Sequence, residues 1–199
     1  MKTIHSVFIL LALFISACAS QPKPYVFKNY EEQSDDLQGN VLVAYATRAG
    51  STIEVADSIA YAIAGKGYTV ELRHIEEVSD LSLYSAIFFG SAIRMGNVTP
   101  EMKKFVERNK AQMGSIPTAY FIVCLTMKDD TPENREKVAE YLTPLRTLVQ
   151  PFAEGYFAGK MDYSKLKRFD RFIVKRMIKA PEGDFRDWNK IREWAEEML

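Results

Sequence analysis

The sequence contains few of the residues that build disulfides, metal centres or charge-driven interfaces. It has two cysteines and two histidines in 199 residues, so no disulfide framework is expected once Cys18 is set aside and only Cys124 remains. We find no Ser-His-Asp set, metal-ligand cluster or catalytic carboxylate pair, and we assign no catalytic residue and no metal site. Basic and acidic side chains number 26 each, so composition indicates neither a nucleic acid nor an acidic partner.

The N-terminal apolar run is too short to span a bilayer as a helix. Val7 to Ile15 follows Lys2 and ends in small residues before Cys18, which is the order of a secretory signal. The ending Ile-Ser-Ala-Cys resembles a bacterial lipobox, in which the cysteine is lipidated. We therefore expect residues 1–17 to be a signal peptide and Cys18 to anchor an exported lipoprotein on the extracytoplasmic side of a membrane. An ordinary signal peptide or an uncleaved anchor is the alternative.

Residues 18–39 are polar and lack sustained periodicity, which predicts a flexible tether after the lipidated cysteine. From residue 40 onward, short apolar runs alternate with segments of helical period. This pattern predicts a single α/β domain over residues 40–199, with a doubly wound parallel sheet and helices on both faces. The five expected strands are Asn40 to Ala46, Thr69 to His74, Ala86 to Gly90, Thr118 to Leu125, and Phe152 to Ala158.

Four helices are expected between and after these strands. One follows the first strand, one begins at Pro100, one runs from Pro132 to about Leu148, and the last contains Trp188 and Trp194. We expect these tryptophans and Cys124 to pack in the core. A lone histidine, His74, ends the second strand, where a surface position is expected.

The turn between the first strand and the first helix has the composition of an anion site. It lacks both the Gly-x-Gly-x-x-Gly spacing and the Gly-Lys-Ser/Thr ending. It offers instead three hydroxyls and a glycine that can take a positive φ, beside helix N–H groups that have no intrahelical partner. The candidate residues are Thr47, Arg48, Ala49, Gly50, Ser51 and Thr52. Such a turn also occurs in folds that bind other phosphates, or nothing.

Two further segments are expected at the same edge, because ligands of open α/β sheets bind beyond the carboxyl ends of the strands. The loop after the third strand contributes Ser91, Ala92, Ile93, Arg94, Met95 and Gly96. The end of the fourth strand contributes Leu125, Thr126 and Met127. We expect Arg94 to lie beside the ligand, and the alternative is a surface ion pair with Glu101.

A basic segment, residues 160–179, separates the last strand from the last helix. It carries eight basic and two acidic side chains, a net charge of +6, whereas the rest of the chain after residue 17 has 17 basic and 24 acidic side chains, or −7. Apolar residues recur in it at helical spacing, so residues 165–179 can form an amphipathic helix that lies on an anionic membrane surface or borders a site for an amphiphilic substrate. The alternative is a helix packed on the domain with a solvated basic face.

Three stretches carry a family resemblance over about residues 40–199. They are YATRAGST, FFGSAIRMGN, and RFDRFIVKRMIK before a tryptophan-containing helix. Together they resemble the menaquinone-dependent protoporphyrinogen oxidase branch of the flavodoxin superfamily. The resemblance implies a flavodoxin-like sheet of strand order 2-1-3-4-5 and an FMN cofactor. The 5′-phosphate would lie on residues 47–52, and the isoalloxazine ring beside residues 91–96 and 125–127.

The sequence departs from the pattern of small flavodoxin carriers and from the family's usual location. Both ring-facing loops lack aromatic residues and net charge is zero, whereas soluble carriers are usually acidic and sandwich the ring with Trp or Tyr. An exported lipoprotein would also not meet protoporphyrinogen in the usual way. We expect a membrane-tethered FMN oxidoreductase that passes electrons between a reduced donor and a quinone. An electron-transfer module docking on a protein partner and a non-redox lipoprotein are the alternatives.

Overall fold

The computed structural model describes residues 27–30, 38–47, 49–166 and 168–199. The expected signal peptide and the expected lipidation site, Cys18, lie outside the described residues. Within these ranges, no helix is both long enough and apolar enough to cross a bilayer.

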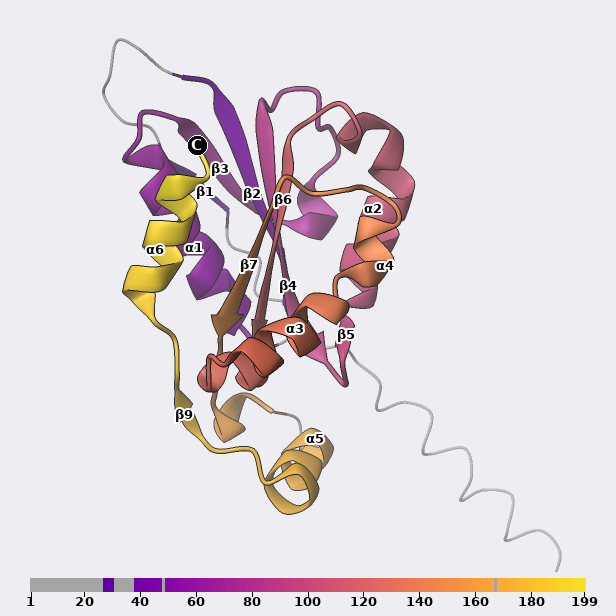
Figure 1. Cartoon of the computed structure of the whole chain (residues 1–199), viewed down its shortest axis with the longest axis vertical. Helices are drawn as coiled ribbons and strands as arrows, with labels where there is room; N and C mark the ends of the chain where they lie inside the picture. The colour runs from indigo at the N-terminus through magenta and orange to yellow at the C-terminus, as the bar shows by residue number, and fades with distance from the viewer. Residues whose placement is uncertain (1–26, 31–37, 48, 167) are drawn as a thin grey trace, which may run out of the picture.

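A parallel sheet of five strands forms the centre of the molecule (Figure 1). Its strands are β2 (Asn40–Ala46), β3 (Thr69–His74), β4 (Ala86–Arg94), β6 (Thr118–Cys124) and β7 (Ala153–Ala158). They lie in the order β3-β2-β4-β6-β7, each parallel to its neighbours. Numbered along the chain, these five strands have the predicted order 2-1-3-4-5, so that prediction is confirmed.

Two short antiparallel strands extend this sheet beyond the prediction. β1 (Lys28–Tyr30) pairs with β3 at one edge, and β5 (Asn97–Val98) pairs with β4. The expectation of a flexible tether over residues 18–39 is therefore wrong at residues 28–30. Lys28 and Tyr30 also bind the carboxylate of Asp57 in the first helix, which fastens this strand to the domain.

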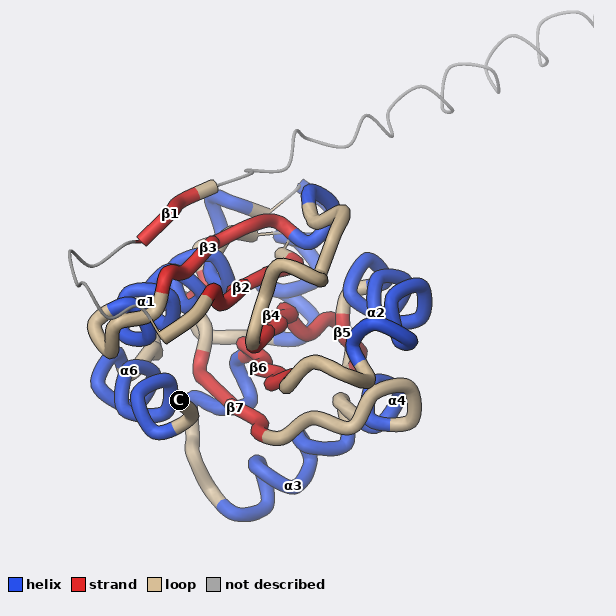
Figure 2. The backbone as a smooth tube through the Cα atoms, turned by 90° about the horizontal axis from the view of Figure 1, so that it is seen from above, coloured by secondary structure: helices blue, strands red, loops and turns tan. Residues whose placement is uncertain are grey.

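Helices cover both faces of the sheet (Figure 2). α1 (Ser51–Ala64) and α6 (Trp188–Glu197) lie on one face. The other face carries α2 (Pro100–Met113), α3 (Pro132–Glu140) and α4 (Thr143–Arg146). The single helix expected from Pro132 to Leu148 is wrong, because two helices occupy that stretch. The break has a local cause, since Pro144 has no N–H to donate to the carbonyl of Glu140.

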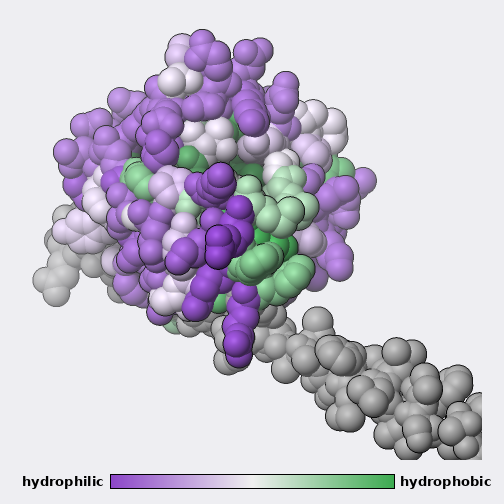
Figure 3. Space-filling view, turned by 90° about the horizontal axis from the view of Figure 1, so that it is seen from below, coloured by the Kyte–Doolittle hydropathy of each residue, from purple (hydrophilic) through white to green (hydrophobic). Residues whose placement is uncertain are grey.

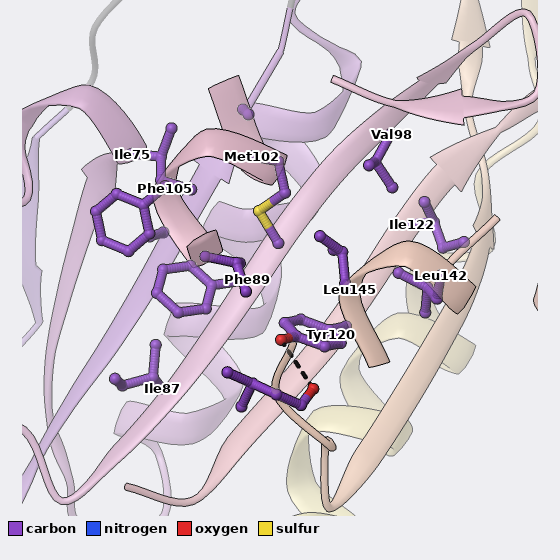
Figure 4. Close-up of a cluster of buried hydrophobic side chains, with 14 of the residues drawn as sticks. Ile75, Ile87, Phe89, Val98, Met102, Phe105, Tyr120, Ile122, Leu142 and Leu145 are labelled. Carbon is purple, nitrogen blue, oxygen red and sulfur yellow. Dashed lines mark hydrogen bonds between the residues drawn. The ribbon is translucent and has the colours of Figure 1, made fainter. Parts of the chain in front are cut away.

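Each face of the sheet has its own hydrophobic core. Ten side chains of the core under α2 and α4 are labelled in Figure 4, where Tyr120 donates a hydrogen bond to the Val149 carbonyl at 3.2 Å. On the opposite face, the ring of Phe121 lies over Gly90 so closely that a Cβ at Gly90 would sit 2.1 Å from Cζ. Phe121 therefore requires a glycine in the neighbouring strand.

Trp194 and Cys124 pack in the core as predicted, and His74 is buried as well. Trp194 packs edge-on against Phe157, with ring centroids 5.5 Å apart, and Cys124 is buried. His74 was expected on the surface but is buried, with its ring 5.4 Å from that of Tyr45. Its Nδ1 accepts the N–H of Glu76, so a backbone donor in the following turn holds it in place.

The basic segment 160–179, which we call the insert, is helical only in its second half. It begins with β8 (Lys160–Met161), which pairs antiparallel with β9 (Gly183–Asp184), and a 3₁₀ turn follows at Tyr163–Lys165. α5 (Arg168–Phe172) then runs into a π-helical segment, Ile173–Ile178. The expected amphipathic helix is thus present over residues 168–178, at the lower end of the molecule in Figure 1.

Candidate functional site

The three predicted segments meet at one edge of the sheet, where four parallel strands end side by side. Register pairs residues near these ends: Ala46 lies beside Ser91, Ala92 beside Val123, and Cys124 beside Ala158. Each segment continues directly from one of these ends. The edge therefore brings together residues that lie far apart in the sequence, as the prediction required.

The first segment is a tight turn into α1. Gly50 precedes the helix with φ 95°, a left-handed conformation that favours glycine. Its N–H donates to Thr47 Oγ1 at 3.2 Å, which closes the turn. Arg48 lies outside the described residues, and Ala49 is exposed. We call residues 47–52 the phosphate loop.

Thr52 is the residue of this loop that most clearly calls for a ligand. Its side chain is fully buried, and among the residues that the structure describes its Oγ1 is the one buried side-chain oxygen or nitrogen without a hydrogen-bond partner. Burying a hydroxyl in this way is costly. Thr52 lies in the first turn of α1, where N–H groups and the helix dipole favour an anion. A phosphate oxygen would satisfy both requirements, so the residues present fit a phosphate group.

A fourth segment, absent from the prediction, adjoins this loop. The chain leaving β7 passes so close to α1 that the N–H of Lys160 donates to Ser51 Oγ at 2.9 Å. A Cβ at Gly159 would lie 3.5 Å from that oxygen and 3.3 Å from Val123 Cγ1. The glycine directly after the last expected strand is the sequence signal for this close approach.

The second segment is a hairpin rather than a loop. β4 continues to Arg94 and returns as β5, with Arg94 paired to Asn97. Met95 and Gly96 make the two-residue turn with φ of 51° and 76°, the positive values that such hairpins need. The expectation that β4 ends at Gly90 is therefore wrong, because β6 pairs with Ser91 and Ala92, and β5 pairs with Ile93 and Arg94.

Ser91 has a structural task within this hairpin. It is fully buried, and its Oγ accepts the N–H of Thr99 at 3.0 Å and donates to the carbonyl of Ala92 at 2.9 Å. These bonds fix the return of the chain into α2. Ala92 and Ile93 are half-buried, and the turn at Met95 is exposed, so the hairpin offers an edge rather than the Ser91 hydroxyl.

The third segment forms a 3₁₀ turn, Leu125–Lys128. Leu125 and Thr126 are half-buried at the edge. Met127 is 3% exposed and packs in the core under α2 and α4, so its side chain serves packing more than the surface of the site.

Acid-base and metal-binding groups are scarce at this edge. Burial raises the pKa of the Cys124 thiol, which keeps it protonated and unreactive at neutral pH. In the described ranges, no three His, Cys, Asp or Glu side chains are grouped to hold a metal ion. What the edge offers is a start of α1 that suits a phosphate, with the hairpin and the third segment at neighbouring strand ends.

Comparison with known proteins agrees with this geometry. The family described as the flavodoxin domain matches residues 42–187. Protoporphyrinogen IX dehydrogenase [quinone] of Escherichia coli strain K12 is 22% identical over 170 residues, covering 79% of this chain and 93% of its own. The Leishmania major protein of that name is 24% identical over 173 residues, covering 79% and 73%.

Solved structures show the same fold. Two-electron reduced flavodoxin of Megasphaera elsdenii is 14% identical, with a TM-score of 0.51, and the match covers 79% of this chain and 98% of that one. At this identity the likeness concerns the arrangement of strands and helices.

Proposed function

The chain belongs to the flavodoxin domain family, and we propose that it binds FMN and passes electrons between a reduced donor and a quinone at a membrane surface. When bound, FMN would supply the electron transfer, and the protein would supply position and electrostatics. The similarity to protoporphyrinogen IX dehydrogenases supports a quinone-linked reaction.

The observation that carries the FMN proposal is the buried, unpartnered hydroxyl of Thr52 at the start of α1. The phosphate of FMN would accept hydrogen bonds from this hydroxyl and from the N–H groups of the first helical turn. The same turn without a phosphate leaves the hydroxyl buried and unsatisfied. Thr47 and Ser51 each accept a backbone N–H, and each hydroxyl retains a proton that it can donate.

The hairpin would hold one side of the isoalloxazine ring. Because Met95 and Gly96 turn through positive φ, the backbone at the tip is fixed in direction before any ligand binds. Arg94 is exposed in the same hairpin, and we propose that it lies beside the ring, where its charge would favour an anionic reduced flavin. Leu125 and Thr126 would line the other side.

An absorption spectrum tests the cofactor. The protein is purified with FMN present and then desalted, and we expect retained flavin bands with about one FMN per chain. A protein that stays colourless would refute the redox proposal and favour the non-redox lipoprotein. Assays with quinols and porphyrinogens would follow a positive result, because the substrate of this chain is the finer part of the proposal.

We propose that the insert is the surface that faces the membrane, because three of its apolar side chains face solvent. Phe169, Phe172 and Met177 are 73%, 59% and 72% exposed, and exposed basic residues of the same helix flank them. Figure 3 views this end of the molecule and shows strongly hydrophilic and hydrophobic side chains next to one another. A helix packed on the domain would bury these rings, so the exposure supports a surface that inserts into an anionic bilayer.

Vesicle binding tests this surface without the lipid anchor. In a Cys18→Ser chain, which cannot be lipidated at that position, four insert cations are changed to glutamine: Arg168, Arg171, Lys175 and Arg176. Each cation near an anionic bilayer contributes about 1 kcal/mol, so binding to phosphatidylserine vesicles should fall by roughly a hundredfold or more. The matched control makes the same charge change on exposed residues of α2: Lys103, Lys104, Arg108 and Lys110.

The control variant should bind vesicles like the parent chain. Equal loss in both variants would mean that overall charge, rather than the insert, drives binding. If neither variant changes binding, the proposed membrane surface is wrong, and a salt-sensitive association with an acidic redox protein becomes the better account of the insert. Mass spectrometry of the mature protein tests lipidation of Cys18 separately.

A further inference from the structure

A buried arginine lies between the phosphate loop and the insert. The side chain of Arg186 is 3% exposed. Its Nη1 lies 2.7 Å from Glu54 Oε2, its Nε lies 2.7 Å from Asp184 Oδ1, and its guanidinium stacks 4.4 Å above the ring of Trp188. A guanidinium held by two carboxylates and an aromatic face has one defined position.

The two carboxylates lie next to the two segments that Arg186 connects, the phosphate loop and the insert. Glu54 is in the first turn of α1, two residues after the phosphate loop. Asp184 is in β9, opposite Lys160 of β8 at the base of the insert. The N–H of Lys160 in turn donates to Ser51 of the phosphate loop. Two independent contacts therefore fasten the base of the insert to the start of α1.

The negative charge of Glu54 would oppose phosphate binding, and the positive charge of Arg186 offsets it. A phosphate bound at the start of α1 carries up to two negative charges, and the Glu54 carboxylate in the same turn would repel it. The ion pair with Arg186 offsets that charge. The same pair leaves Glu54 tied to the insert.

We propose that Arg186 is a positioning residue that neutralises Glu54 for phosphate binding and couples the phosphate loop to the insert. This inference rests on the proposed binding of FMN. Because coupling between two sites is reciprocal, FMN should reduce the mobility of the insert base, and loss of the Arg186 contacts should weaken FMN. Riboflavin has the same ring without the phosphate, so its binding should be indifferent to Arg186.

The first test compares flavins in an Arg186→Gln protein. We expect its FMN dissociation constant to rise about tenfold, within the usual range of coupling energies, while that of riboflavin changes less than about twofold. The double variant Glu54→Gln/Arg186→Gln should recover most of the FMN affinity, because the repelling charge is gone. Arg146→Gln is the matched control, since it breaks a comparable pair with Glu154 near the start of β7. It should leave both flavins unaffected.

The second test measures hydrogen exchange of residues 160–184 with and without FMN. FMN should slow exchange at the insert base in the parent protein and slow it less in Arg186→Gln, where the Lys160–Ser51 contact alone remains. If that variant does not fold, Glu54→Gln alone decides the matter: it should bind FMN as tightly as the parent or tighter, yet show less FMN-dependent protection than the parent. Its weaker binding of FMN would refute the electrostatic argument.

Failure of the coupling and failure of the proposed function give different results. A parent protein that binds neither flavin refutes the FMN proposal and the coupling that rests on it. A parent that binds FMN, with Arg186→Gln losing FMN and riboflavin equally or neither of them, refutes only the role of Arg186.

Discussion

Replacing Thr52 with valine should stabilise the flavin-free protein and weaken its binding of FMN. Valine has nearly the shape of threonine and removes only the hydroxyl, which is buried without a partner. An unsatisfied buried hydroxyl costs about 1–3 kcal/mol, so the free energy of unfolding without FMN should rise by about 1–2 kcal/mol. For a chain of this size that raises the thermal midpoint by roughly 2–4 °C per kcal/mol.

The effect on binding has the opposite sign. A hydrogen bond to a charged group contributes about 1.5–3 kcal/mol, so FMN should bind roughly tenfold to a hundredfold more weakly. Isothermal titration with FMN and thermal unfolding of the flavin-free protein measure the two effects separately. A purely structural role for Thr52 cannot produce a higher free energy of unfolding together with a lower FMN affinity.

Thr118→Val is the matched control. Thr118 is also a buried threonine, but its hydroxyl donates to the Ile116 carbonyl at 3.0 Å, at the far end of the strands. Its replacement should lower the free energy of unfolding by about 1 kcal/mol and leave FMN affinity unchanged. Our reasoning fails if Thr52→Val destabilises the flavin-free protein as Thr118→Val does, or if it binds FMN normally.

Three further predictions concern the scaffold. Gly90→Ala should lower the free energy of unfolding by about 1–3 kcal/mol, since the new methyl group collides with Phe121; an unchanged urea midpoint would contradict the packing. Met95→Asn should raise the thermal midpoint slightly, because asparagine tolerates the positive φ better than methionine does; a lower midpoint would contradict the turn assignment. Burial opposes ionisation of Glu154, yet hydrogen bonds led by that from Arg146 lower its pKa below the ordinary 4.5. The stabilisation of the folded protein by ionised Glu154 is therefore present above about pH 4.5 and lost as the pH falls through the folded-state pKa. Urea unfolding from pH 7 to 3 should show a smaller acid-dependent loss in Arg146→Gln.

The short-range pattern of the sequence was sufficient for the sheet. Apolar runs bounded by turns located all five parallel strands. The resemblance to flavodoxins implied their order, and the rule that ligands bind beyond the carboxyl ends of the strands indicated the edge of the sheet. The phosphate loop could also be predicted from the sequence, because a strand, a small hydroxyl-rich turn and a helix are contiguous from Asn40 to Ala64. Periodicity also predicted the amphipathic helix of the insert.

Other features depend on partners far away in the chain, so no local pattern contains them. Ser91 was expected to face the ligand, but its hydroxyl bonds Thr99 once β5 folds back on β4. His74 is buried because Tyr45 and the following turn surround it. Met127 is predicted beside the isoalloxazine ring because it follows a strand end, yet it packs in the core.

By itself, the sequence determined the positions of the parallel strands, the phosphate loop and the amphipathic character of the insert, because hydrophobic period and turn chemistry are properties of neighbouring residues. Only the tertiary structure decided that Thr52 is buried without a partner and that Lys160 binds Ser51, 109 positions away. The same holds for Arg186, which reaches Glu54 across 132 positions. Hydrogen-bond satisfaction and ion pairing depend on which side chains the fold brings within about 3 Å, and that is decided by the packing of whole elements.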